Sequence, residues 1–104
     1  MGNETYQLKI FPLAQHDLEQ IFDYISVELC NTTAAMRQIN DFENAFENIC
    51  IFPESCPVVD NKYVKDKSLR KLVVNNYIAF YRARERQIQV IRVLYGMRDY
   101  EVLL

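Results

Sequence analysis

Residues 69–99, LRKLVVNNYIAFYRARERQIQVIRVLYGMRD, decide the fold of this 104-residue chain. Two long β-type runs, 77–83 and 88–94, are separated by the charged tetrapeptide 84–87, and a shorter run, 69–74, precedes them. Runs of β-branched and aromatic residues bounded by polar turns predict a three-stranded antiparallel meander. The strands contain Arg70, Arg82 and Arg92, and Arg98 follows them. Because arginine is costly in a sheet unless it meets an anion or water, these side chains predict a surface for a negatively charged partner.

The first half of the chain predicts the scaffold of this sheet. Residues 5–10 alternate between apolar and polar, as in a half-buried strand, and Pro12 then stops the strand and can open a helix. Apolar residues at three- and four-residue steps predict a helix over 13–29 and a second one that starts at the capping residues Asn31 and Thr32 and ends at Pro53. Their short connection predicts an antiparallel hairpin. We therefore expect one α+β domain over residues 1–104: an N-terminal strand, the helix hairpin, the meander and a short C-terminal tail, 97–104.

Alternation also predicts which side chains share a face of the sheet. In one strand these are Tyr77, Ala79, Tyr81 and Ala83, and in the next strand Ile88, Val90, Arg92 and Leu94. We expect the helix hairpin to cover one side of the sheet and the more polar side to meet solvent or a ligand.

Charge is distributed unevenly along the chain. Residues 1–61 hold two basic and ten acidic residues, whereas residues 62–104 hold ten basic and four acidic ones, within a net charge of −2. Either the basic half meets an anion such as nucleic acid or an acidic protein segment, or the two halves attract each other. No apolar run is long enough to span a membrane and no signal-peptide layout is present, so we expect a cytoplasmic protein without a membrane partner, with three reduced cysteines.

The sequence lacks the motifs of most enzyme classes. It has no glycine-rich phosphate loop, no metal-ligand cluster and a single histidine, so we expect neither a cofactor nor a metal. The remaining candidates are basic residues and one tyrosine: Lys65, Lys67, Arg70, Arg82, Arg92, Tyr95 and Arg98. Metal-free RNA cleavage needs such groups, because arginine can stabilise the charge on phosphorus while tyrosine or lysine moves protons. The same surface could merely bind.

Structural roles remain open for several of these residues. An ion pair with Asp99 or Glu101 would explain Arg92, and an ion pair with Asp99 would explain Arg98. Lysines at 62, 65 and 67 lie in the aperiodic segment 54–68, which we expect to be a mobile loop; they either bind phosphates or are ordinary surface residues.

Two segments carry a resemblance to a known family. RKLVVNNYIAFYR at 70–82 and VIRVLYGMRDYEVLL at 90–104, in this order of elements, resemble the RelE/ParE superfamily of bacterial type II toxin-antitoxin toxins. The resemblance implies a helical hairpin packed on an antiparallel sheet, a cognate antitoxin that wraps the toxin, and a plasmid-stabilisation type of operon. Operator DNA would be bound only indirectly, through the antitoxin. The antitoxin would bring an acidic amphipathic segment to a groove between the helices and the sheet, bordered by basic strands.

The superfamily divides by target. RelE-type members cleave messenger RNA on the ribosome, whereas ParE-type members poison DNA gyrase. Here Tyr77 is followed by Ile78 rather than by the arginine of the nuclease branch, and residues 92–99, RVLYGMRD, are closer to the RVLHGxRD pattern of ParE-like sequences. Arg70, Arg92 and Arg98 match arginines of that pattern, and Tyr95 takes a position where histidine is frequent.

The resemblance implies a toxin that arrests growth when its antitoxin is lost, with either the ribosome and its messenger RNA or DNA gyrase as target. In the nuclease alternative, Arg82, Arg92 and Arg98 clamp phosphates, Tyr95 transfers protons, and Lys65, Lys67 and Arg70 bind the target. The other alternative is a degenerate toxin or non-toxic module that only binds an antitoxin-like partner.

Overall fold

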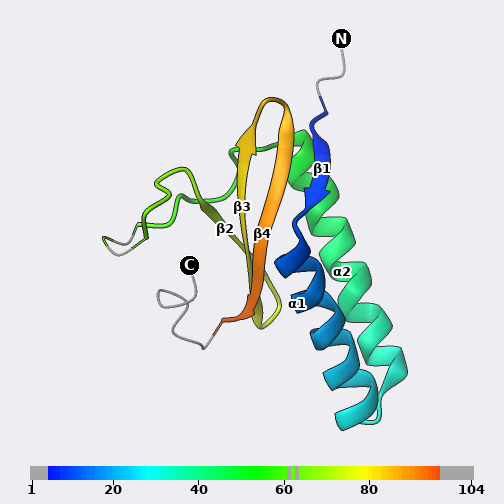
Figure 1. Cartoon of the computed structure of the whole chain (residues 1–104). Coiled ribbons are helices and arrows are strands. Elements are labelled where there is room, and N and C mark those ends of the chain that lie inside the picture. Colours follow the sequence, from blue (N-terminus) through cyan, green and yellow to red (C-terminus); the bar gives the residue numbers. More distant parts are fainter. Residues whose placement is uncertain (1–4, 61, 63, 97–104) are drawn as a thin grey trace.

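The computed structural model describes residues 5–60, 62 and 64–96. Its elements are β1 (Gln7–Ile10), α1 (Pro12–Asp23), η1 (Tyr24–Glu28), α2 (Thr32–Ile51), β2 (Arg70–Val74), β3 (Tyr77–Arg84) and β4 (Gln87–Tyr95). The helices lie along one side of the sheet, and the segment between α2 and β2 extends from the other side (Figure 1). The predicted α+β order is confirmed; the predicted tail, 97–104, lies outside the described residues.

The four strands lie in the order β1-β4-β3-β2. The meander β2-β3-β4 is antiparallel, as predicted, and β1 adds to it in parallel, pairing with residues 87–90 of β4. The β3-β4 turn is tight because Glu85 and Arg86 both adopt the left-handed conformation, with φ of 51° and 62°, which matches the twist of a two-residue hairpin. Since β1 stops at Ile10, the second half of the β4 edge is left to another element.

The two helices form because the chain supplies their start signals. Pro12 is the first residue of α1, where its missing N–H costs nothing. The helix continues into one π-helical turn, η1, and the chain then reverses. The side chain of Asn31 accepts a hydrogen bond of 3.0 Å from the N–H of Ala34, which confirms it as the cap of α2.

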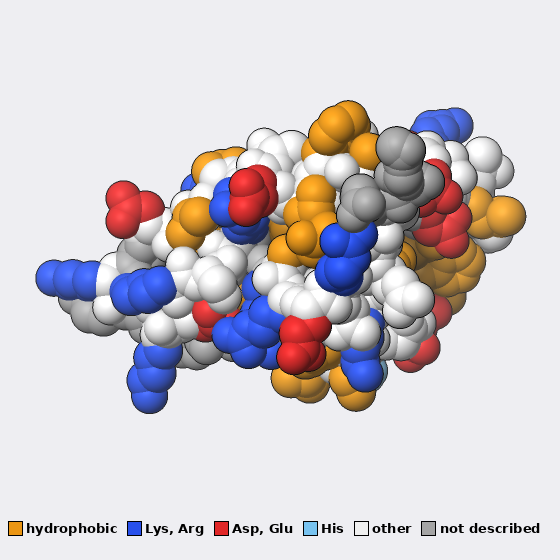
Figure 2. Space-filling model, turned by 90° about the horizontal axis from the view of Figure 1, so that it is seen from above, with side chains coloured by type: hydrophobic (Ala, Val, Ile, Leu, Met, Phe, Trp, Pro, Cys, Tyr) orange, Lys and Arg blue, Asp and Glu red, His pale blue; other side chains and the backbone are white. Residues whose placement is uncertain are grey.

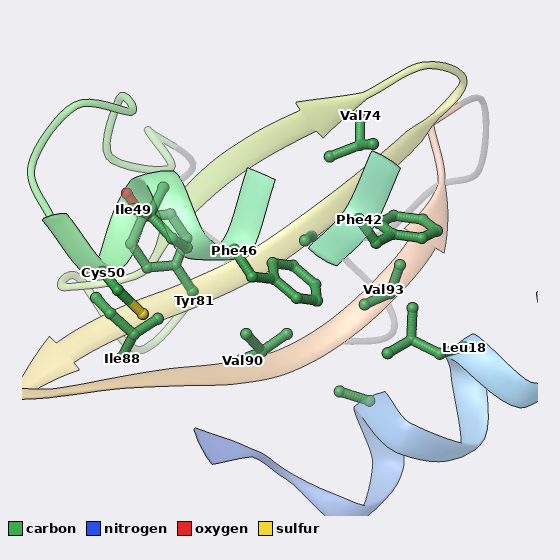
Figure 3. Packing of buried hydrophobic residues seen from close by; sticks show 12 residues of the cluster. Leu18, Phe42, Phe46, Ile49, Cys50, Val74, Tyr81, Ile88, Val90 and Val93 are labelled. Carbon is green, nitrogen blue, oxygen red and sulfur yellow. The ribbon is translucent and has the colours of Figure 1, made fainter. Parts of the chain in front are cut away.

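The main core lies between the helices and one side of the sheet, which we call the helix side (Figure 3). Its fully or largely buried members come from both helices and from three strands: Ala14, Leu18, Phe42, Phe46, Ile49, Cys50, Val74, Ala79, Tyr81, Ile88, Val90 and Val93. The predicted shared face of Tyr77, Ala79, Tyr81 and Ala83 is confirmed, because all four belong to or pack against this core.

The predicted face of β4 is wrong in its second half. The β3-β4 register shifts between Phe80 and Tyr81, so that one extra residue, Ile91, is inserted in β4. Val93 therefore joins Ile88 and Val90 on the helix side, whereas Leu94 points to the opposite side, the outer side. A β-bulge cannot be read from alternation, because it changes the period by one residue.

A second, smaller core covers the outer side of the sheet. Val59, Val64 and Leu69 of the segment after α2 pack there with Phe80 and Leu94. The segment is also hydrogen-bonded to β2, since the N–H of Lys71 donates to the oxygen of Pro57 at 3.0 Å. The described residues of 54–68 form no helix or strand, as predicted, and Val59, Val64 and Leu69 anchor the segment to the sheet.

Candidate functional site

Arg92 and Asp17 form the most enclosed ionic contact in the described part of the chain. The Nε of Arg92 donates to Asp17 Oδ2 at 2.7 Å and its Nη2 donates to Oδ1 at 2.9 Å. The backbone N–H of Val93 donates to the same Oδ2 at 2.9 Å. These hydrogen bonds connect α1 to the part of the β4 edge that β1 leaves unpaired. The hydrogen bonds that Arg92 donates to Asp17 raise the pKa of Arg92, although burial opposes this effect.

Arg82 lies on the outer side of the sheet in a second ionic cluster. Its Nη1 is 2.8 Å from Asp66 Oδ2, and its Nε donates to Gln89 Oε1 at 2.7 Å. Burial alone would raise the pKa of Asp66, but hydrogen bonds from Ser68 and Arg82 outweigh it and lower that pKa to about 2. The cluster ties the segment after α2 to β3. Arg84 approaches the same oxygen only to 3.9 Å and keeps about half of its side chain exposed.

The ring of Phe11 lies close to Arg82 and to a second cation, Lys9. The ring centroid of Phe11 lies 5.8 Å from Lys9 Nζ and 5.8 Å from Arg82 Cζ. Each of these two cations is at a distance where a cation and the face of an aromatic ring attract. Arg82 therefore has a cation–π contact with Phe11 in addition to its contacts with Asp66 and Gln89.

The three residues predicted to bind the target are divided between two sides. Lys65 and Lys67 are exposed on the segment after α2, where Lys and Arg side chains mark the left of the view from above (Figure 2). Arg70 instead pairs with Tyr81, which is buried on the helix side. Its Nη1 donates to the oxygen of Cys56 at 2.7 Å, so Arg70 holds a loop in place.

Tyr95 lies in a groove of about 900 Å³ between the helix hairpin and the far ends of the strands. Its ring packs edge-on against Tyr77, with centroids 5.9 Å apart. Burial, together with the neighbouring Tyr24 and Tyr95, raises the pKa of Tyr77. The groove's charged lining is Asp17, Arg37 and Asp41, so the basic border predicted for a groove between helices and sheet is not found among the described residues.

The structure thus does not bring the predicted catalytic residues together. Arg82 is on the outer side, Tyr95 is in the groove on the helix side, and Arg92 reaches α1 at the edge of β4; Arg98 lies outside the described residues. Within residues 5–60, 62 and 64–96, no three His, Cys, Asp or Glu side chains are grouped so as to hold a metal ion. The catalytic assignment of these residues stays a prediction.

Sequence reasoning missed the two carboxylates that engage the arginines. Asp17 lies three residues after Ala14 and four before Ile21, within the apolar stripe of the first helix. A carboxylate inside such a stripe indicates a buried partner. Asp66 carries no comparable signal, because its loop has no periodicity.

Two solved structures show the same fold. One is the chromosomal ParDE toxin-antitoxin system from P. aeruginosa, with a TM-score of 0.70 and 19% identity over 89% of this chain and 98% of that chain. The other is the RelBE2 toxin-antitoxin complex from Mycobacterium tuberculosis, with a TM-score of 0.61 and 14% identity over 88% of this chain and 98% of that chain.

The family itself follows from the sequence model that matches residues 8–100, described as the ParE toxin of the type II toxin-antitoxin system, parDE. The chain belongs to this family. No curated protein matches it. No helix in the described ranges is both long and apolar enough to cross a membrane.

Proposed function

We propose that this ParE-family chain is the toxin of a type II module and that it arrests growth by binding DNA gyrase rather than by cutting RNA. Its proposed partners are a cognate antitoxin, which neutralises it, and gyrase, its target; both act in the cytoplasm. The two structural relatives are toxin-antitoxin systems or complexes, which supports an antitoxin here.

The observation that carries the proposal is the closed contact between Arg92 and Asp17. A phosphate clamp needs guanidinium N–H groups that face the ligand, but Nε and Nη2 of Arg92 both donate to Asp17. An RNA phosphate held bidentately by Nε and Nη2 would have to displace a carboxylate whose side chain is only 9% exposed. Asp17 would then keep only the hydrogen bond from the Val93 N–H, at a cost of about 2 kcal/mol, which is comparable to the gain from one hydrogen bond between charged groups.

The position of Tyr95 supports the same proposal. A general acid or base must come within hydrogen-bond reach of the atom that it protonates or deprotonates. Tyr95 is on the helix side beside Tyr77, whereas Arg82 is on the outer side, so the sheet lies between the predicted proton-transfer group and one of the predicted phosphate clamps. Binding to a protein target has no such requirement.

The test is to induce the protein alone in bacteria and to map transcript ends while following DNA-damage signalling and cell length. We expect growth arrest with filamentation, induced DNA-damage signalling and unchanged transcript ends, and the same outcome for Tyr95→Phe, which removes only the hydroxyl. New transcript ends that disappear in Tyr95→Phe would overturn the proposal in favour of ribosome-dependent cleavage. Unimpaired growth of cells that accumulate the folded protein would show a module that only binds a partner.

A further inference from the structure

A second groove runs between α1 and α2 beside β1, and we call it the inter-helix groove. It has a volume of about 810 Å³. Its apolar lining comes from β1 and both helices: Leu8, Ile10, Leu18, Phe22, Ile39, Phe42 and Phe46. Its charged lining is entirely acidic: Glu19, Asp23, Glu43 and Glu47.

The four carboxylates form two rows. Glu19 and Asp23 are four residues apart on α1, and Glu43 and Glu47 are four residues apart on α2, so each pair lies on one face of its helix. All four are exposed, and none forms an ion pair with a lysine or arginine of the described ranges. Like charges at this spacing repel by a few tenths of a kcal/mol per pair, and an incoming cation relieves that repulsion.

The lining between the rows remains partly open to solvent. Leu8 is 43% exposed, and Phe22 and Ile39 are half-buried. The 12 residues of α1 span roughly 18 Å at 1.5 Å per residue. A partner helix of about three turns therefore matches the length of the inter-helix groove, with its apolar side on the floor and one flank toward each acidic row.

We propose that the inter-helix groove docks a cationic amphipathic helix, with an apolar stripe flanked on both sides by lysine or arginine, that belongs to the neutralising antitoxin. The identity of the partner rests on the proposed function; the chemistry of the docked segment rests on the groove. The expected acidic segment does not suit this surface, because it would meet two rows of carboxylates. A second copy of the chain packed groove to groove would double the same repulsion.

The experiment uses two designed fluorescent peptides with the same leucine stripe, one with lysine and one with glutamate at all flanking positions. Binding to the full-length protein is measured by fluorescence anisotropy at low and high salt. The groove variant combines Glu19→Gln, Asp23→Asn, Glu43→Gln and Glu47→Gln. The control variant combines Glu28→Gln, Glu54→Gln, Asp60→Asn and Glu85→Gln, which change the net charge equally but lie outside the groove.

The lysine peptide is expected to bind the wild type and the control variant alike, and the groove variant about tenfold more weakly. High salt reduces that difference, and the amide signals that shift in NMR spectra belong to α1 and α2. Equal binding to both variants, no binding, or equal binding of the glutamate peptide overturns the proposal. A wild-type dimer in sedimentation that Phe22→Ala dissociates also overturns it, because a second copy would then occupy the groove.

Growth assays separate this inference from the proposed function. The groove variant is expected to retain the wild-type growth arrest when induced alone, because it changes none of the residues predicted to bind the target, Lys65, Lys67 and Arg70. If the wild type fails to arrest growth while the lysine peptide still discriminates between the variants, the toxin proposal fails and the groove chemistry stands.

Discussion

Replacing Asp17 is the perturbation that most directly probes how the fold holds the sheet to the helices. Asp17→Ala removes both bonds to Arg92 and the only described partner of the Val93 N–H. Breaking a buried pair from one side costs about 3–5 kcal/mol, and the 19% exposure of the Arg92 side chain places this case near the lower limit. We therefore expect the free energy of unfolding to fall by about 3 kcal/mol.

Replacing Arg92 instead of Asp17 is expected to lower the free energy of unfolding by a smaller amount. Arg92→Met leaves Asp17 hydrogen-bonded to the Val93 N–H, so the loss should be about 2 kcal/mol. In the double variant neither charge is left unpaired, and the total loss should be about 3 kcal/mol, which corresponds to a coupling of about 2 kcal/mol.

Equilibrium urea unfolding at neutral pH measures all three variants. Asp23→Asn is the control, because Asp23 is an exposed aspartate of the same helix and should change stability by less than about 0.5 kcal/mol. Losses for the two single variants that simply add in the double variant would refute the coupling between α1 and β4.

Other variants test other parts of the fold. Tyr81→Phe removes a hydroxyl that donates to the Pro53 oxygen at 2.9 Å, and we expect a loss of about 1 kcal/mol in urea unfolding; an unchanged midpoint would contradict this bond. The folded-state pKa of Asp66 is about 2, below its ordinary 3.8, so its contribution is complete above about pH 4 and is lost as the pH falls toward 2. Asp66→Asn should therefore flatten the fall in stability over that window, and a slope equal to that of the wild type would refute the contact with Arg82. Asn31→Ala removes the cap of α2 and should cost about 1 kcal/mol, measured by thermal unfolding with Asn31→Ser as the tolerated control.

Local patterns were sufficient to predict most of the architecture. The helical stripes, the Asn31 cap and the strand runs of 69–94 are read from neighbouring residues, and the structure confirms all of them. The parallel pairing of β1 with β4 could not be predicted from the sequence, because it joins residues about 80 positions apart. The bulge at Ile91 could not be predicted either, because it interrupts the alternation from which side chains were assigned to the two faces of the sheet.

The candidate site was harder to predict for a related reason. Positions in the sequence indicated which residues were basic, but not which carboxylate each would meet. Arg92 was expected to pair with Asp99 or Glu101 if it had a structural role. Those two residues lie outside the described ranges, and the partner that the structure describes is Asp17, 75 residues away. The missing information was the location of α1 along the open edge of β4, which only the assembled fold supplies.

The central claim, that this toxin acts on gyrase and not on RNA, is tested most directly by a supercoiling assay with purified gyrase and the purified protein. We expect the wild type, Tyr95→Phe and Arg82→Gln to inhibit supercoiling, or to accumulate cleaved DNA, at similar concentrations. Unimpaired supercoiling at concentrations well above those that arrest growth in cells would contradict the claim.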